Sequence, residues 1–179
     1  MKIYHGSLEV IERPLILQPN RLLDYGKGFY TTTSERQAKE WVERRMIENN
    51  TTCGYVNVYE LNEERLTDLK RLTFSEPTKE WADFVMANRT QKGFIHDYDI
   101  VYGPVANDRV YLQFGLYETG AISVETLIRE LKTYKLVDQY LFHTEKALTA
   151  LHWRKRSIPT HSGWLYPLTF DAGKGLKEA

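Results

Sequence analysis

Hydrophobic and polar residues follow two different periods along the chain. At 55–61, Val56 and Val58 alternate with more polar neighbours, which is the period-two pattern of a half-buried strand. Runs of aromatic and β-branched residues, which fit a pleated sheet, predict further strands. The expected strands span 2–4, 29–33, 55–61, a segment that ends at Tyr102, and 138–143, and 10–17 is expected to be extended chain.

Apolar residues at helical spacing predict helices between these strands. The helices are expected at 34–47, from Ser75 or Thr78 to Asn88, from Ser123 through Leu131, and from Thr144. Ser34 and Gln37 form a capping-box pattern at the start of the first helix. The last helix would have an apolar face made of Ala147, Leu148 and Leu151.

These elements predict a single α+β domain, because strands and helices occur without the strict alternation of a parallel sheet. A chain of 179 residues is the size of one domain. We expect this domain to span 1–153 and to be followed by a loosely packed tail at 154–179, which is rich in Gly, Pro and Ser. The basic triplet Arg154-Lys155-Arg156 is interpreted as a solvated helix end.

Composition removes several classes of function from consideration. The 24 basic and 24 acidic residues cancel, which argues against a nucleic-acid or anionic-membrane partner. Cys53 is the single cysteine, the first residues lack the apolar run of a signal peptide, and no apolar run is long enough for a membrane helix. We therefore expect a cytoplasmic protein without a membrane partner. The chain has no CxxC, HExxH, Walker or strand-linked GxGxxG sequence, so metal, P-loop and Rossmann sites have no support.

The stretch from Asp24 to Trp41 is the strongest candidate for a binding site. Gly26 and Gly28 allow positive φ or close approach of a ligand to bare backbone, and Tyr30 follows on the expected strand. Trp41 has two interpretations: it lies on the buried face of the helix beside Ala38 and Val42, or it forms a wall of the site. The sequence pattern favours the buried face.

Two polar segments are further candidates, each with a plain structural alternative. His5-Gly6-Ser7 follows the first strand and offers three kinds of hydrogen-bonding group, or it is only a turn with His5 in solvent. Asn107 and Asp108 belong to a polar turn before the apolar run 110–117. They either make Asx-type bonds to their own backbone or line a pocket.

Three separated segments together resemble the signature strands of the ADP-ribosyltransferase superfamily, in its His-Tyr-Glu branch. They are His5-Gly6-Ser7, Gly26-Lys27-Gly28-Phe29-Tyr30, and Asp138-Gln139-Tyr140-Leu141-Phe142. The resemblance is closer still to a bacterial family of uncharacterised domains within that superfamily, which shares the Gly-Pro-Val-Ala-Asn-Asp turn. It implies a split β-sandwich of two small, mostly antiparallel sheets flanked by helices.

The resemblance implies NAD as the substrate and a role for each matched residue. His5 would bind ribose hydroxyls, the Gly6 backbone would bind the nicotinamide amide, and Tyr30 would stack on the nicotinamide ring. The implied catalytic residues are His5, Tyr30 and Gln139. The implied cofactor-binding residues are His5, Gly6, Ser7, Gly28, Tyr30, Trp41, Asn107 and Asp108, and no metal site is implied.

Gln139 departs from the superfamily pattern, which most often has glutamate at this position. An amide can hold a ribose hydroxyl but has no negative charge to stabilise an oxocarbenium-like transition state. Asp138 should face the opposite side of the strand, so Asp108 and Glu145 remain as acids that could assist.

The implied function is mono-ADP-ribosylation of a protein or nucleic-acid target, as the toxin or effector of a bacterial conflict system with an antitoxin or immunity protein as partner. The alternative is a catalytically weak or inactive module that binds NAD or ADP-ribose. A third branch of the superfamily, the RNA 2′-phosphotransferases, is disfavoured by the zero net charge.

Overall fold

The protein folds as an α+β structure with two small β-sheets. The structure is a computed structural model that describes residues 1–17, 23–106, 108–133 and 136–157. Its strands are β1 (Lys2–Ser7), β2 (Phe29–Thr31), β3 (Tyr55–Leu61), β4 (Arg71–Thr73), β5 (Ile100–Pro104), β6 (Asp138–Phe142) and β7 (Leu151–Ser157). Its helices are α1 (Glu35–Glu48), the 3-10 helix η1 (Glu63–Leu66), α2 (Lys79–Thr90), α3 (Asp108–Glu118), α4 (Val124–Thr133) and α5 (Glu145–Leu148).

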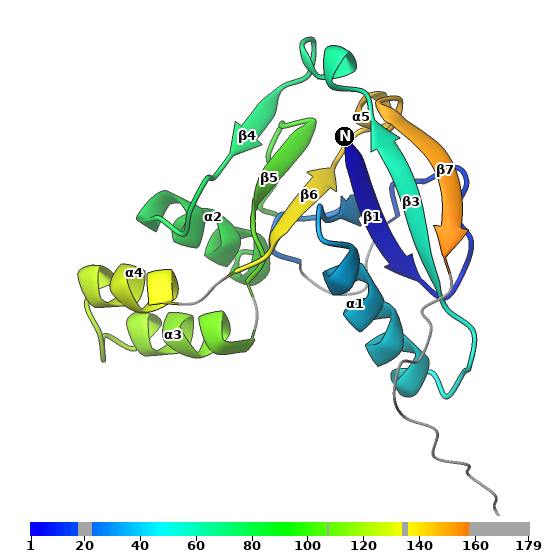
Figure 1. Ribbon diagram of the computed structural model, residues 1–179. Helices are drawn as coiled ribbons and strands as arrows, with labels where there is room; N and C mark the ends of the chain where they lie inside the picture. Colours follow the sequence, from blue (N-terminus) through cyan, green and yellow to red (C-terminus); the bar gives the residue numbers. More distant parts are fainter. Residues whose placement is uncertain (18–22, 107, 134–135, 158–179) are drawn as a thin grey trace, which may run out of the picture.

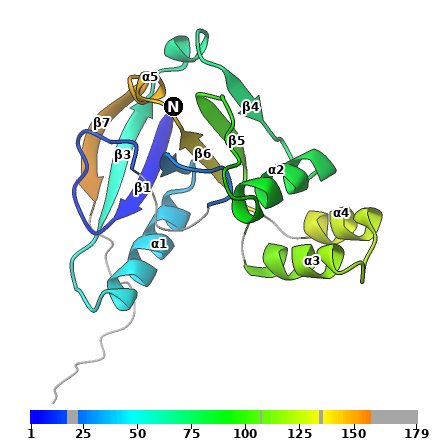
Figure 2. The same cartoon turned by 180° about the vertical axis from the view of Figure 1, so that it is seen from behind.

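The sheets have the strand orders β1-β3-β7 and β2-β6-β5-β4. All neighbouring strands are antiparallel except β4 and β5, which are parallel. The expected α+β class with mostly antiparallel sheets is therefore confirmed. A bridge between Tyr4 and Thr32 joins β1 to the residue that directly follows β2 of the other sheet. The two sheets lie side by side and splay apart (Figures 1 and 2).

Three apolar clusters hold the layers together. One contains residues of both sheets, among them Ile3 of β1, Phe29 of β2 and Phe142 of β6. A second packs helices α2, α3 and α4 on the opposite face of the second sheet, and its buried members are Tyr25, Trp81, Ala82, Val85, Val101, Ala106, Val110, Phe114, Leu127, Leu131 and Leu141. A third packs α1 on β3. Helices α2, α3 and α4 therefore cover the face of the second sheet to which Tyr30 and Leu141 belong, whereas η1 and α5 contribute Leu66, Ala147 and Leu148 to the first cluster.

Helix α1 begins as its capping pattern predicts. The Ser34 hydroxyl accepts a hydrogen bond from the Gln37 backbone N–H, which satisfies an otherwise unpaired donor of the first turn. The Gln37 side chain does not complete the capping box, because its Oε1 accepts from the Thr32 hydroxyl at 2.6 Å. Thr144 caps α5 in the same way through the Ala147 N–H.

The C-terminal part of the described chain differs from the prediction. Helix α5 ends at Leu148, and Leu151 begins strand β7 instead of continuing the helix. Residues 154–156 belong to β7, which pairs with β3, so their interpretation as a solvated helix end is wrong. The expected tail boundary at 154 falls inside this strand, and residues 158–179 lie outside the described part of the chain.

Candidate functional site

His5 lies on β1, and its ring contacts the backbone of β2. Its Nδ1 lies 2.6 Å from the backbone oxygen of Tyr30. A carbonyl only accepts, so Nδ1 carries the proton and Nε2 is the acceptor nitrogen of the ring. The ring also packs on Phe29 with a centroid separation of 4.4 Å, and burial lowers the pKa of His5. The interpretation of His5 as a solvated turn residue is therefore wrong.

Gly6 and Gly28 are explained by close packing within the protein. A Cβ at Gly6 would lie 2.5 Å from the carbonyl oxygen of Ala38 in α1. A Cβ at Gly28 would lie 2.4 Å from the carbonyl oxygen of Phe142, and Gly28 has a φ of 146°. Both glycines are thus required by the fold itself. Ser7, which follows Gly6 at the end of β1, accepts a hydrogen bond from the Glu9 N–H.

Tyr30 is held in place by the turn that precedes it. Its hydroxyl donates to the Gly26 carbonyl at 2.7 Å and accepts from the Tyr25 N–H at 3.1 Å. Burial, with a further contribution from the charge of Asp24, raises the pKa of Tyr30, so its phenol stays protonated. The two hydrogen bonds therefore hold the half-buried Tyr30 side chain against the backbone of Tyr25 and Gly26.

Gln139 lies on the same face of the sheet as Tyr30. Tyr30 pairs with Leu141, so Gln139, two residues earlier on β6, is its diagonal neighbour on that face. The Gln139 Nε2 donates to Asp24 at 2.9 Å and to the Pro104 carbonyl at 3.4 Å. Asp138 points to the opposite face, as the strand alternation predicts.

Asp24 is the acid in contact with Gln139, and it was not among the expected ones. It is 5% exposed and receives hydrogen bonds from side chains of α2 and α3 and from the backbone before α3. Its donors among the described residues are Arg89, Ala106, Tyr111 and Gln139. The available signal was its place directly before Tyr25 and the glycine turn.

The remaining expected site residues have different outcomes. Trp41 is 37% exposed while Ala38 and Val42 are buried, so its expected place in the core is wrong. Its ring lies beside Gly6, since a Cβ there would be 3.2 Å from Trp41 Cδ1. Asp108 is the first residue of α3, and Asn107 lies outside the described residues. Glu145 is exposed in the first turn of α5.

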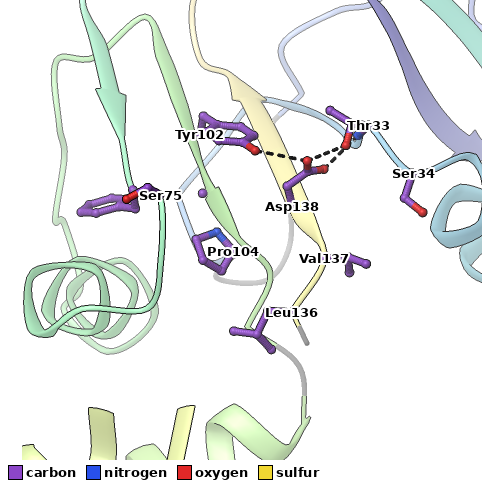
Figure 3. A pocket seen from close by; sticks show the side chains of 10 residues that line it. Thr33, Ser34, Ser75, Tyr102, Pro104, Leu136, Val137 and Asp138 are labelled. Carbon is purple, nitrogen blue, oxygen red and sulfur yellow. Dashed lines mark hydrogen bonds between the residues drawn. The ribbon is translucent and has the colours of Figure 1, made fainter. Parts of the chain in front are cut away.

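A polar cavity of about 280 Å³ lies at the start of β6, where Asp138 and not Gln139 lines it. Figure 3 shows the Asp138 carboxylate between Tyr102 and Thr33. Asp138 accepts from the Thr33 N–H at 2.9 Å and from the Tyr102 hydroxyl at 3.2 Å. These bonds tether the turn before α1 to β6 and β5. A second cavity of about 220 Å³ lies between α2 and α3, beside Arg89 and Tyr111. His5, Tyr30 and Gln139 line neither cavity.

The fold and site define an α+β protein in which residues of three separated segments belong to one hydrogen-bonded region. His5 bonds to Tyr30, Tyr30 bonds to Tyr25, and the neighbouring Asp24 bonds to Gln139. Residues 1–153 match the model of a family described as a protein of unknown function, DUF3990, and the chain belongs to this family. No curated protein and no solved structure gives a significant match. None of the helices in the described ranges is long and apolar enough to cross a membrane.

Proposed function

We propose that the protein is an NAD-dependent mono-ADP-ribosyltransferase. The observation that supports this proposal is the arrangement of the three matched segments. The His5 ring bonds to the Tyr30 backbone, and Tyr30 and Gln139 are diagonal neighbours on one face of the sheet. Exposed Trp41 lies beside Gly6, on the helix that follows the Tyr30 strand. In this proposal an aromatic ring, a neutral imidazole and an amide would contact one ligand.

The proposed reaction breaks the bond between the nicotinamide nitrogen and C1′ of the ribose. The bonding electrons leave with nicotinamide, and a nucleophile of the target attacks C1′ and loses its proton to solvent. Tyr30 stacks on the flat, cationic nicotinamide ring. The ribose hydroxyls donate hydrogen bonds to His5 Nε2, the acceptor nitrogen, and to Gln139 Oε1. These bonds hold the sugar in position.

The second candidate is a module that binds NAD or ADP-ribose without turnover. The observation that favours it is the state of Asp24, the acid that Gln139 contacts. Its carboxylate is already paired with Arg89 at 2.6 Å and accepts from the Ala106 N–H at 3.0 Å. A carboxylate with these partners is not free to act as a base.

Measurement of nicotinamide release, with mass spectrometry of added protein and RNA targets, tests the first proposal. Wild type should release nicotinamide and add a mass of one ADP-ribose to a target, and His5→Ala and Tyr30→Ala should abolish both. His152→Ala, on the exposed side of β7, is the matched control and should retain activity. Binding of NAD without any release would favour the binding module, and the absence of binding would reject both candidates.

A further inference from the structure

The amide of Gln139 has one orientation. Its side chain is 8% exposed, and its Nε2 faces Asp24 Oδ2 at 2.9 Å and the Pro104 carbonyl at 3.4 Å. Both of these oxygens only accept hydrogen bonds, so the NH₂ end must face them. Oε1 is therefore the end that points away from Asp24 and Pro104.

Asp24 is fixed as firmly as the amide that it contacts. The Arg89 guanidinium donates to Oδ1 through Nε at 2.9 Å and Nη2 at 2.6 Å, and the Tyr111 hydroxyl donates to the same oxygen. The Ala106 N–H donates to Oδ2 at 3.0 Å. The bond to Gln139 uses Oδ2, the oxygen that Arg89 does not contact. Gln139 is thus in direct contact with the carboxylate through Oδ2, and the Arg89 guanidinium contacts the other carboxylate oxygen, Oδ1.

We propose that Asp24 is the positioning residue for Gln139, holding the amide with Oε1 turned away from Asp24 and Pro104 and supplying, one hydrogen bond behind it, the negative charge that a glutamate would carry. This inference rests on the proposed function, in which Oε1 accepts a ribose hydroxyl. A charged acceptor on Nε2 polarises the amide and makes Oε1 a stronger acceptor, and low local dielectric strengthens this effect. The catalytic contact stays with Gln139, and Asp24 acts through it.

The contact between Asp24 and position 139 can be tested without NAD. In Gln139→Glu, two carboxylates would face each other in a buried place, so one of them must keep its proton. The charged and titratable groups around the pair are Arg89 on α2, Tyr111 on α3, and Tyr25 and Tyr30 beside the turn. The tyrosines stay neutral, because burial raises the pKa of each.

The pKa of the new carboxyl pair is raised in the folded state. The Gln139→Glu variant therefore keeps its stability at low pH and loses stability as the pH rises. The Tm of Gln139→Glu should be close to that of wild type at about pH 4.5 and lower by about 5 °C or more at about pH 7.5. Adding Asp24→Asn to this variant removes the like charge, so the difference should no longer grow with pH. A difference between Gln139→Glu and wild type that stays constant from acid to neutral pH would overturn the inference.

The positioning role is tested by NAD titration calorimetry. In Asp24→Asn, the Gln139 amide can turn to bond the new NH₂ group, which takes Oε1 away from the ligand. The Kd for NAD should rise at least about tenfold, while Asp83→Asn, which removes a carboxylate paired with Lys79 on the surface of α2, should leave it unchanged. An unchanged Kd in folded Asp24→Asn would overturn the positioning role. If wild type does not bind NAD but Gln139→Glu shows the expected pH dependence, the proposed function fails and the Asp24–Gln139 pairing stands.

Discussion

Gln139 of β6 donates its amide to the buried carboxylate of Asp24 at 2.9 Å, across 115 positions of sequence. The contact links the third matched segment to the turn that precedes the Tyr30 strand. It also connects the sheet to helices α2 and α3 through Arg89 and Tyr111. The candidate site and the packing of the helices therefore depend on the same carboxylate.

Removal of this carboxylate should destabilise the fold. Asp24→Ala leaves the Arg89 guanidinium, the Ala106 N–H and the Gln139 amide without their acceptor. Loss of one partner of a buried ion pair costs about 3–5 kcal/mol, and we expect about 3 kcal/mol because the Arg89 side chain is 32% exposed. Urea unfolding measures this loss, and a change below about 1 kcal/mol would show that the pair is not formed in solution.

Gly6 should tolerate no side chain because of helix α1. In Gly6→Ala the new Cβ would lie 2.5 Å from the backbone oxygen of Ala38, which cannot move without displacing the helix. Overpacking of this kind costs about 1–3 kcal/mol, measured by urea unfolding. The matched control is Gly115→Ala in α3, where the Cβ meets nothing within 4 Å. It should stabilise the protein by about 0.5–1 kcal/mol, because alanine is the better helix former. Equal effects at the two positions would contradict the packing of α1 on β1.

Stability should fall as the solution becomes mildly acidic. Burial lowers the pKa of His5 and of His96 below the ordinary value of 6.5, and the adjacent His143 lowers that of His96 further. The neutral rings are favoured in the folded state, so their contribution is present above pH 6.5 and is lost as pH falls through the folded pKa values. Tm measured from about pH 7.5 to about pH 5 should decrease, and less so in His96→Asn. An identical pH profile for this variant would contradict the burial of His96.

Trp41 separates a structural role from a binding role. Because its side chain is 37% exposed, Trp41→Ala should lower the free energy of unfolding by no more than about 1 kcal/mol. If Trp41 lines the proposed NAD site, the same variant should weaken NAD binding by about five- to thirtyfold, since stacking on an indole contributes on the order of 1–2 kcal/mol. Thermal unfolding and NAD calorimetry on one sample give both values. A large loss of stability with unchanged NAD affinity would show that Trp41 has a structural role and does not bind NAD.

Local patterns predicted much of this fold. Ser34 and Thr144 cap their helices through the expected backbone groups, and Asp138 and Gln139 point to opposite faces as alternation requires. Strand β7 was missed because the consecutive basic residues 154–156 are all exposed on an edge strand, so they give no period-two pattern. Its existence depends on pairing with β3, which is distant in sequence.

The candidate site was predicted only in part, for a similar reason. His5, Tyr30 and Gln139 lie on separate strands, and a short pattern does not say which acid a fold brings to an amide. Asp24 contacts Gln139 in a fold in which β2, the strand that follows the Asp24 turn, pairs with β6. Trp41 was misplaced because its helical spacing matches that of Ala38 and Val42, although the helix turns its ring to the edge of the packed face.

His5, Tyr30 and Gln139 are proposed to belong to one NAD site. Titration calorimetry with NAD on wild type, His5→Ala, Tyr30→Ala and Gln139→Ala tests this proposal most directly, with His152→Ala as the matched control. We expect saturable binding at a single site in wild type and in His152→Ala, and a loss of affinity of at least about tenfold in each of the other three variants. Absence of saturable NAD binding by the folded wild-type protein would contradict the proposal.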